Sequence, residues 1–293
     1  MKASVFHITN DITQDQVEAG RLQEVYDISV ESGKNINLPS AFETDVRTDV
    51  VRKAVRVSRA NRRQAYGSKQ QKGKKRPMPG MRHSVEWWGK GRGVSRILRK
   101  TGAKTGVENP HTRGGRRAHG PKVEKDWSMA MNTTERRLAR DSALAATADK
   151  DIVSTRGHRF HDEIDALPLI IGDYKEVRDE GEESMDIEAF SLEHPTRKLI
   201  AILESLGLGD DLQRARDGRK VRAGKGTMRG RRHRTPKSVL MVVSQKSGLA
   251  MAGRNIPGVD VVSVRDLAAE DLAPGGDVGR LTVFTKKAVE ELA

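Results

Sequence analysis

One long segment in the first half of the chain cannot build a hydrophobic core of its own. Residues 65–127 hold 17 Lys and Arg, 4 Asp and Glu, 11 Gly and 4 Pro, with no sustained helical or strand periodicity. Such a stretch is uncommon inside a compact domain, so it is either a disordered insertion or a functional extension that a partner orders. Trp87, Trp88 and Trp127 favour the extension, because aromatic faces among arginines can stack on exposed bases. For Trp127, packing where the segment returns to the body is the plainer expectation.

The positive charge of the chain is concentrated in two places. The 293 residues carry a net charge of +14, of which residues 65–127 hold +13 and residues 214–237 hold +10. Subtracting these two segments leaves −9 for the rest of the chain. A body that is acidic to neutral, with two basic segments, indicates a polyanionic partner rather than a charge spread evenly for solubility.

The rest of the chain is apolar enough to fold. Hydrophobic residues make up 35% of the sequence, which allows one large domain or two small ones. Helical periodicity predicts a helix within residues 44–63 and another that Asn132 caps, with Glu135 completing a capping box. A further helix is predicted to begin at Pro195 and end at Gly207. The residues of this last helix that we expect to point inward are Leu199, Ile202, Leu203 and Leu206.

Short apolar runs predict the strands. They occupy residues 167–172, 238–244, 259–264 and 280–285, with a further candidate at 3–8. Near-continuous apolar strands that alternate with helices are typical of a mostly parallel sheet covered on both faces. The acidic run that follows the first of these four strands, residues 173–188, reads as an exposed loop or helix edge.

The predicted fold class is therefore α/β: a mostly parallel sheet with helices on both faces, interrupted by a long basic non-globular loop extension. Residues 1–64 and 128–293 are predicted to form the α/β globular body, which contains a basic segment at 213–237. Residues 65–127 are predicted to form the extended basic loop.

The helix predicted within residues 44–63 has two unlike faces. Its apolar face is formed by Val46, Val50, Ala54 and Val57. Its opposite face carries Arg52, Arg56, Arg59 and Arg63. Charge runs are commonly just solvated, but a stripe of one sign without interleaved acids suits a phosphate backbone.

The glycine-rich stretch RAGKGTMRGRRHR does not fit a nucleotide site. A P-loop requires G-x-x-x-x-G-K-[ST] between a strand and a helix. Gly218 and Gly224 are one residue too far apart, and Lys225 is followed by Gly226 instead of the hydroxyl residue that holds magnesium. The spacing also fails the G-x-G-x-x-G dinucleotide fingerprint. Arginines and lysines among glycines instead suit close contact with a nucleic-acid backbone.

Other catalytic and metal chemistry has little support. The chain has no cysteine, and no G-x-S-x-G nucleophile elbow is present. His158 and His161 lack a third metal ligand at a familiar spacing, so we expect one to be packed and the other solvated. No cofactor, metal site or enzyme activity is predicted. The apolar runs are too short to span a membrane and the first residues lack a secretory signal, which predicts a soluble intracellular protein.

Several blocks of sequence, in order, resemble the archaeal and eukaryotic type of the L4 family of large-subunit ribosomal proteins. The resemblance runs from about residue 24 nearly to the C-terminus. The blocks are LPSAFETDVRTDVVRKAVRVSRANRRQAYG (38–67), WGKGRGVSR (88–96), RGGRRAHGPKVEKDW (113–127), NTTERRLARDSALAATAD (132–149) and APGGDVGRLTVFT (273–285).

This resemblance implies a structural role in the cytoplasmic ribosome. The α/β body would lie on the large subunit and bind large-subunit rRNA, and the family takes part early in subunit assembly. The extended loop would penetrate the rRNA, with its tip in the wall of the polypeptide exit tunnel. The implied partners are large-subunit rRNA, neighbouring large-subunit proteins including the L22-family protein at the tunnel constriction, and the nascent peptide. No membrane partner is implied.

The resemblance also assigns residues of the loop and of the second basic segment to these roles, and the charge pattern adds the helix arginines. The tunnel-loop tip candidates are Trp87, Trp88, Gly89, Lys90, Gly91, Arg92 and Gly93. With the helix arginines Arg52, Arg56, Arg59 and Arg63, the rRNA-binding candidates are Lys90, Arg92, Arg96, Arg113, Arg116, Arg117, His119, Lys122, Arg222, Lys225, Arg229, Arg231, Arg232 and Arg234.

Two alternatives share the same charge pattern. A ribosome-associated or free RNA-binding factor would not be permanently assembled into the subunit. An α/β enzyme could use a basic insertion to position a polyanionic substrate. The role of residues 1–23, which are longer than the usual entry into the first strand of the family, is open at this point.

Overall fold

The computed structural model describes residues 1–17, 21–67, 84–107, 109–113, 119, 121–178, 181–189, 194–246 and 248–292. The chain divides into two units. The α/β unit comprises residues 1–58 and 130–293, and the insertion unit comprises residues 59–129.

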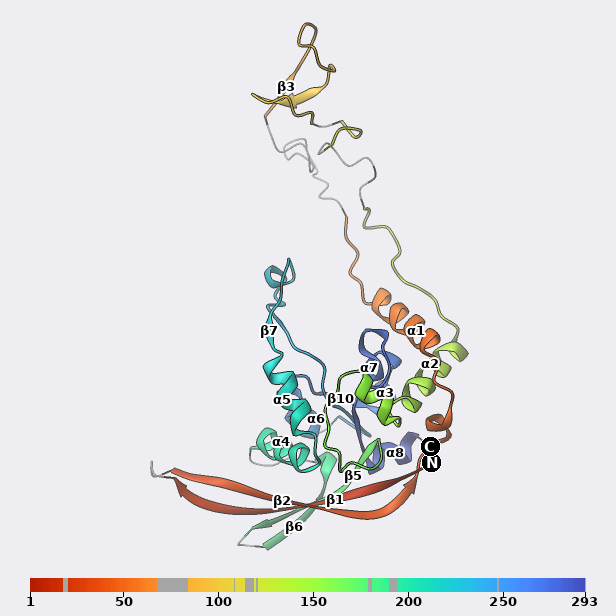
Figure 1. Ribbon diagram of the computed structural model, residues 1–293, viewed down its shortest axis with the longest axis vertical. Helices are drawn as coiled ribbons and strands as arrows, with labels where there is room; N and C mark the ends of the chain where they lie inside the picture. Colours follow the sequence, from red (N-terminus) through yellow and green to blue (C-terminus); the bar gives the residue numbers. More distant parts are fainter. Residues whose placement is uncertain are drawn as a thin grey trace. The chain divides into compact units, whose positions relative to one another are not determined.

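A mostly parallel sheet forms the centre of the α/β unit (Figure 1). Its strand order is β10–β9–β11–β5–β1–β2, with β6 also paired to β5. The ladders from β10 through to β1 are parallel, whereas β1–β2 and β5–β6 are antiparallel hairpins. The strands are β1 (Lys2–Val17), β2 (Arg21–Asn37), β5 (Leu169–Arg178), β6 (Gly181–Asp186), β9 (Leu240–Val243), β10 (Asp260–Ser263) and β11 (Thr282–Thr285).

Helices cover both faces of this sheet, as the continuous apolar strands predict. Met241 and Val243 of β9 pack in one hydrophobic cluster, and Leu240 and Val242 pack in the other. Successive side chains of a strand point to opposite faces, so every residue of β9 is buried. The first cluster includes residues of α4 (Pro195–Ser205), α5 (Gly209–Asp217), α6 (Gly248–Arg254) and α3 (Lys150–Thr155). The second includes residues of α1 (Thr48–Asn61), α2 (Thr133–Ala145), α7 (Ala269–Leu272) and α8 (Lys286–Leu292).

The acidic run at residues 173–188 is not a loop or a helix edge as predicted, because most of it forms the β5–β6 hairpin. Tyr174 and Glu176 are buried on one side of β5, and they alternate with the exposed Asp173 and Lys175. The Glu176 carboxylate can be buried because it accepts hydrogen bonds from the buried Lys198 ammonium on α4, at 3.0 and 3.1 Å. A buried charge needs such a partner, and the run of acids concealed the strand alternation.

Two local predictions need correction at the helix starts. Asn132 is the N-cap residue of α2 as predicted, but its side chain makes no capping hydrogen bond. The Glu135 carboxylate binds the Lys53 ammonium at 2.7 Å instead of closing a capping box. On α1, Val46 precedes the helix and is exposed, whereas Val51 and its neighbours on that face are the more deeply buried residues.

The prediction for the helix beginning at Pro195 is confirmed. The four residues expected inward are all buried, and α4 ends before Gly207, whose φ is 77°. Glycine adopts this left-handed conformation without strain, which is why it ends the helix.

The insertion unit contains a second, smaller sheet. Strand β3 (Val85–Trp87) pairs antiparallel with β4 (Leu98–Lys100). Val107 is 1% exposed and its N–H donates to the carbonyl of Leu98, which adds a third segment to this small structure. The β3–β4 hairpin is therefore the main regular structure among the described residues of this unit.

Removing the ammonium of Lys198 tests the buried pair. Lys198→Met leaves the carboxylate of Glu176 buried without its cation, so we expect the free energy of unfolding to fall by about 3–5 kcal/mol. Urea unfolding of the full chain measures this loss. Lys175→Met, on the exposed side of β5, is the matched control and should change the value by less than about 0.5 kcal/mol.

The double variant Lys198→Met/Glu176→Met should recover most of the lost stability, because it removes the orphaned charge as well as its partner. A double variant that is as unstable as the single one would show that packing, not charge pairing, explains the loss.

Candidate nucleic-acid interface

The arginines predicted on α1 do not form one uniform stripe. Arg52 is ion-paired with Asp277, with Nη2 and Oδ1 3.2 Å apart. Arg56 and Arg59 are exposed, and no carboxylate pairs with them among the described residues. Arg63 lies beyond the helix end and stacks on aromatic rings of the insertion unit. Of the four, Arg56 and Arg59 are therefore the ones with their charges uncommitted.

The second basic segment forms a small hairpin in the α/β unit. Strands β7 (Lys220–Val221) and β8 (His233–Arg234) pair antiparallel, and the turn η3 (Thr227–Arg229) lies between them. The hairpin extends beyond α5 (Figure 1). Gly224 and Gly230 have φ of 84° and 76° with open space around them, so these two positions require glycine for the turn itself rather than for packing.

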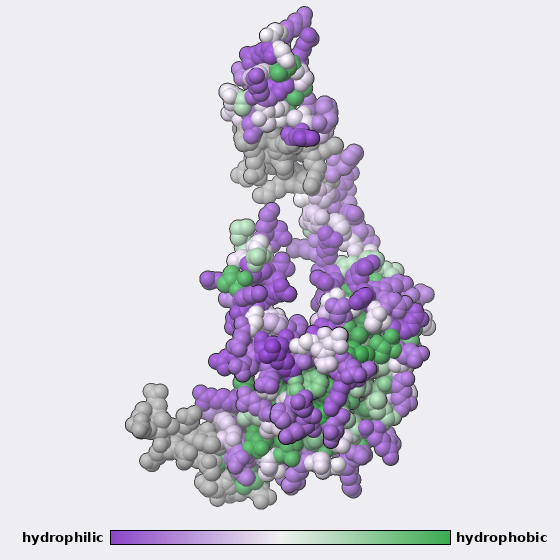
Figure 2. Space-filling view, viewed as in Figure 1, coloured by the Kyte–Doolittle hydropathy of each residue, from purple (hydrophilic) through white to green (hydrophobic). Residues whose placement is uncertain are grey.

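This β7–β8 hairpin concentrates cations without neutralising them. Residues 220–234 contain seven Lys and Arg and no Asp or Glu. Lys225, Arg229, Arg231, Arg232 and Arg234 are all exposed and have no carboxylate partner among the described residues. Hydrophilic residues dominate the visible surface around the hairpin, with a small apolar patch near its end (Figure 2). Exposed charges of one sign in a narrow loop generate a strong local positive potential.

Arg222 differs from its neighbours in the same segment. Its Nε donates to the carbonyl of Arg231 at 3.2 Å and its Nη2 to that of His233 at 3.4 Å. Its own carbonyl accepts the hydroxyl of Thr227 at 2.6 Å. The guanidinium therefore ties the two sides of the hairpin together and sets the shape in which the other cations are presented.

The candidate tip residues begin at Trp87, the last residue of β3, and continue into the loop between β3 and β4. Trp88 contacts two guanidinium groups, with the Cζ atoms of Arg92 and Arg99 4.5 and 5.6 Å from its ring centroid. Gly91 and Gly93 have φ of 81° and 64°, which favours glycine at both positions. These contacts give the loop an internal structure built on cation–π stacking.

Arg99 of β4 makes several hydrogen bonds that hold the neighbouring loops in place, and the sequence did not predict this role. It is 8% exposed and donates to the carbonyl and hydroxyl of Ser95, each at 3.0 Å, and to the carbonyl of Lys104. The signal that could have identified it is its position on a strand opposite Glu86, but strands of three residues are not recognisable from periodicity.

The remaining candidate side chains of the insertion unit are mostly exposed. Trp87 is 64% exposed, so its ring is available for stacking. The exposed cationic candidates are Lys90, Arg92, Arg96, Arg113, His119 and Lys122. Arg116 and Arg117 lie outside the described residues. These six cationic candidates thus share solvent exposure.

Trp127 joins the outgoing and returning limbs of the insertion unit. Its ring stacks on Tyr66 with centroids 5.3 Å apart, and the Arg63 guanidinium lies 3.9 Å from its centroid. The Lys125 ammonium lies 4.4 Å from the same ring. Trp127 therefore packs where the segment returns, on residues of the insertion unit itself.

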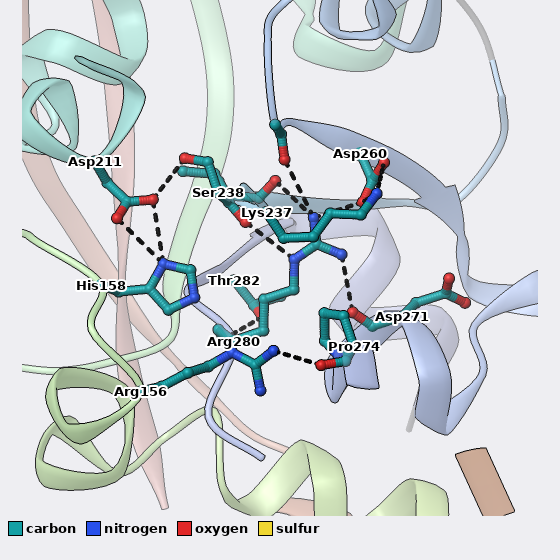
Figure 3. Close-up of polar contacts among 12 residues, drawn as sticks. Arg156, His158, Asp211, Lys237, Ser238, Asp260, Asp271, Pro274, Arg280 and Thr282 are labelled. Carbon is teal, nitrogen blue, oxygen red and sulfur yellow. Dashed lines mark hydrogen bonds and ion pairs between the residues drawn. The ribbon is translucent and has the colours of Figure 1, made fainter. Parts of the chain in front are cut away.

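Asp211 binds residues on both sides of the second basic segment in the sequence, and these contacts are called the anchor of that segment. The sequence did not predict this role. This buried residue on α5 accepts hydrogen bonds from Ser238 Oγ at 2.5 Å and from Arg214 Nε at 2.8 Å. Nδ1 of His158 lies 3.1 and 3.2 Å from its two oxygens (Figure 3). Since α5 precedes the β7–β8 hairpin and Ser238 follows it, these contacts hold the two ends of the segment together.

The electrostatics of Asp211 follow from these contacts. Burial by itself raises the pKa of the carboxyl group, but hydrogen bonds from His158, Arg214 and Ser238 outweigh burial and hold the pKa well below its usual range. Asp211 is therefore ionised in the folded protein throughout the neutral range, and its charge contributes to the anchor.

A neighbouring guanidinium is buried even more completely. Arg280 is 1% exposed and donates to the carbonyls of Ser238, Asp271, Gly258 and Val239. Its Nη2 also binds Asp260 Oδ2 at 2.6 Å (Figure 3). This single side chain connects β9, β10, β11 and α7.

The histidine prediction is confirmed as far as packing is concerned. His158 is buried against Asp211, whereas the side chain of His161 is 58% exposed. Across the part of the chain that the structure describes, no group of three or more His, Cys, Asp or Glu side chains is placed to hold a metal ion. No described helix has the length and apolar character needed to cross a membrane.

Fold and surface together define an α/β protein with a mostly parallel sheet that presents glycine-rich cationic loops. The sequence profile of the ribosomal protein L4/L1 family matches residues 36–293. The chain is 41% identical over 269 residues to the large ribosomal subunit protein uL4 of Halobacterium salinarum, covering 92% of this chain and 98% of that protein. It is 42% identical over 273 residues to uL4 of Methanopyrus kandleri, covering 92% and 96%.

This chain therefore belongs to the ribosomal protein L4/L1 family, in its archaeal form. The family profile begins at residue 36, near the end of β2. Strand β1, which pairs with β5 at the centre of the sheet, precedes the matched region. The first residues are thus an integral part of the sheet.

Neutralising Asp211 tests the anchor of the basic segment. Because its folded-state pKa is depressed, the charge stabilises the fold fully above its ordinary pKa of about 3.9. This contribution is lost as the pH falls through the lower folded-state pKa. Asp211→Asn should lower the free energy of unfolding at pH 7 by about 3 kcal/mol, and urea unfolding should show a smaller difference from the wild type at pH 3.

Asp210→Asn, on the exposed side of the same helical turn, is the matched control and should have little effect at either pH. A deficit for Asp211→Asn that is equal at pH 7 and pH 3 would show that the charge of the carboxylate does not contribute.

Proposed function

We propose that this protein is a structural constituent of the large ribosomal subunit that binds large-subunit rRNA and supports subunit assembly. The observation that carries the proposal is the β7–β8 hairpin, whose exposed cations have no carboxylate partners among the described residues. Membership of a ribosomal protein family supplies the identity of the polyanion. Backbone contacts of this kind neutralise phosphates without reading base sequence.

The proposed contacts differ in kind between segments. Lys225, Arg229, Arg231, Arg232 and Arg234 bind phosphates directly, since their charges are exposed and have no carboxylate partner in the described part of the chain. Arg222 holds the hairpin in shape. On α1, Arg56 and Arg59 add further phosphate contacts.

Residues 65–127 have a second proposed role. We propose that this extended basic loop penetrates the rRNA and that its tip, around residues 87–93, contributes to the wall of the polypeptide exit tunnel. The exposed ring of Trp87 and the arginine-flanked ring of Trp88 support stacking on bases or contact with the nascent peptide. The L22-family protein at the tunnel constriction and other large-subunit proteins are the proposed protein neighbours.

The proposed location is the cytoplasmic ribosome, and the proposed role is not catalytic. The alternative is a ribosome-associated factor that exchanges with the subunit. Sedimentation after a high-salt wash separates the two roles. Retention near one copy per large subunit supports a permanent constituent, whereas release into the light fractions supports the exchanging factor.

Replacing two adjacent hairpin arginines tests the RNA-binding surface. For Arg231→Ala/Arg232→Ala, loss of two phosphate contacts should weaken binding to a large-subunit rRNA fragment and reduce the slope of log K against log salt by about 1.5. Filter binding at several salt concentrations measures both quantities.

The matched control is Arg136→Ala/Arg137→Ala, which removes two adjacent exposed arginines from α2. It should retain most of the wild-type slope. A hairpin variant that binds rRNA with unchanged affinity and slope would remove the β7–β8 hairpin from the proposed interface.

A further inference from the structure

A cavity in the α/β unit lies beside the anchor of the basic segment. It has a volume of about 670 Å³ and is lined by residues of α1, α3, α5 and the loop at 274–278. Four of its lining residues are the cations Arg52, Arg156, Arg214 and Lys237, against the two acids Asp151 and Asp277. All of these residues belong to the α/β unit. The cavity is therefore a depression lined by more cations than acids, and it lies within a single unit of the chain.

Three of the four cations already have a carboxylate partner. Arg52 binds Asp277 at 3.2 Å, Arg214 binds Asp211 at 2.8 Å, and Lys237 binds Asp260 at 2.7 Å. Pairs of this kind neutralise most of the field of each cation.

Arg156 is different, because no carboxylate lies within ion-pair distance of it among the described residues. Its guanidinium donates only to main-chain carbonyls, with Nη2 2.8 Å from the oxygen of Pro274 and Nη1 3.3 Å from that of Val278. A guanidinium has five N–H donors in a planar fork, so donors are left over for a ligand. Figure 3 shows this side chain below Arg280, with one edge turned to Pro274.

The surroundings of Arg156 disfavour its positive charge. Burial lowers the pKa of its guanidinium, and the nearby charges of Arg280 and Arg214 lower it further, with Asp277 opposing them. A partly buried cation beside other cations is stabilised when an anion is added. The free protein therefore holds an unsatisfied preference for a negative ligand at this point.

The loop that holds Arg156 is tightly fitted, so the site is formed in advance. Gly275, Gly276 and Gly279 all have positive φ. At Gly279 a Cβ atom would lie 2.6 Å from Cγ2 and 2.8 Å from the carbonyl oxygen of Ile152 on α3. The loop can approach α3 this closely only with glycine there, and that approach brings the carbonyls of Pro274 and Val278 to Arg156.

We propose that this cavity binds a phosphate group, with Arg156 as its principal ligand and the ion-paired Arg52 and Lys237 as flanking hydrogen-bond donors. Guanidinium groups match the geometry of phosphate oxygens. The volume exceeds that of a lone phosphate and suits one attached to a nucleoside. The phosphate therefore belongs either to an RNA strand or to a free nucleotide. Its assignment to rRNA rests on the proposed function, whereas the site itself does not.

Isothermal titration of the full chain with AMP, and separately with inorganic phosphate, tests the site. The wild type should bind AMP saturably, and Arg156→Gln should raise the Kd about ten- to a hundredfold through loss of charged hydrogen bonds. Arg254→Gln, an exposed arginine on α6, is the matched control and should leave the Kd unchanged. Absence of saturable AMP binding by the wild type, or an unchanged Kd for Arg156→Gln, overturns the proposal.

A second variant acts in the opposite direction and keeps the test decisive if Arg156→Gln fails to fold. Asp277 is 71% exposed, so Asp277→Asn should be tolerated while it removes a negative charge from the cavity. AMP should then bind more tightly, by about two- to tenfold. An unchanged or weaker affinity for Asp277→Asn counts against a phosphate at this position.

Competition with the rRNA fragment distinguishes the two sources of phosphate. If the ligand is an RNA phosphate, rRNA displaces AMP and Arg156→Gln weakens rRNA binding. If the ligand is a free nucleotide, the rRNA complex still binds AMP. The Arg231→Ala/Arg232→Ala variant should keep its AMP affinity in either case; an equal loss there would place AMP on the β7–β8 hairpin and overturn the cavity site. Wild type that binds AMP but not rRNA refutes the proposed function alone.

Discussion

The buried guanidinium of Arg280 is the interaction on which the C-terminal half of the sheet depends. Its hydrogen bonds reach carbonyls at the start of β9, before β10 and at the end of α7, and its charge is balanced by Asp260. The carbonyls of Gly258 and Val239 also accept the N–H groups of Ser238 and Asp260, so the guanidinium adds a second donor to each of them and binds the carbonyls of Ser238 and Asp271 as well. One side chain therefore satisfies several main-chain groups and fixes where three parallel strands begin.

The cations of this protein fall into two groups, those that are paired with a carboxylate and those that are not. Within the α/β unit, the buried or half-buried cations Lys198, Arg214 and Arg280 have carboxylates beside them, whereas Arg156 has none among the described residues. In the β7–β8 hairpin the same residue types have none among the described residues, and they are exposed. The low dielectric of the interior requires neutralised charges, whereas an exposed loop can hold a net charge until a polyanion arrives. The chain thus uses arginine both as an internal crosslink and as a surface ligand.

Sequence reasoning could predict what depends on periodicity and composition. The runs at 238–244, 259–264 and 280–285 are near-continuously apolar, which is typical of parallel strands covered on both faces, and they contain β9, β10 and β11. The β5–β6 hairpin was missed because Glu176 is buried only by virtue of Lys198, which is distant in the sequence. The same reason explains why the roles of Asp211, Arg99 and Arg156 were not predicted. These roles depend on hydrogen-bond partners that only the fold brings near. The phosphate-binding assignments on the hairpin and α1, and the extent of the extended loop, stay predictions.

The order of strands in the sheet also has a consequence for synthesis. Strand β5 (Leu169–Arg178) lies between β1 (Lys2–Val17), which is made first, and β11 (Thr282–Thr285), which is made long afterwards. Strand β1 can pair with β2 at once, but its parallel neighbour β5 is made only after the whole cationic insertion has been translated. The first residues of β5, which pair with β11 and not with β6, keep one open edge until β11 emerges. Pairings between such distant segments form slowly and leave strand edges exposed. The cationic segments of a nascent chain of this protein are therefore exposed before its hydrophobic core is complete. The chain is most open to aggregation, and to binding an incorrect polyanion, before it is released from the ribosome that makes it.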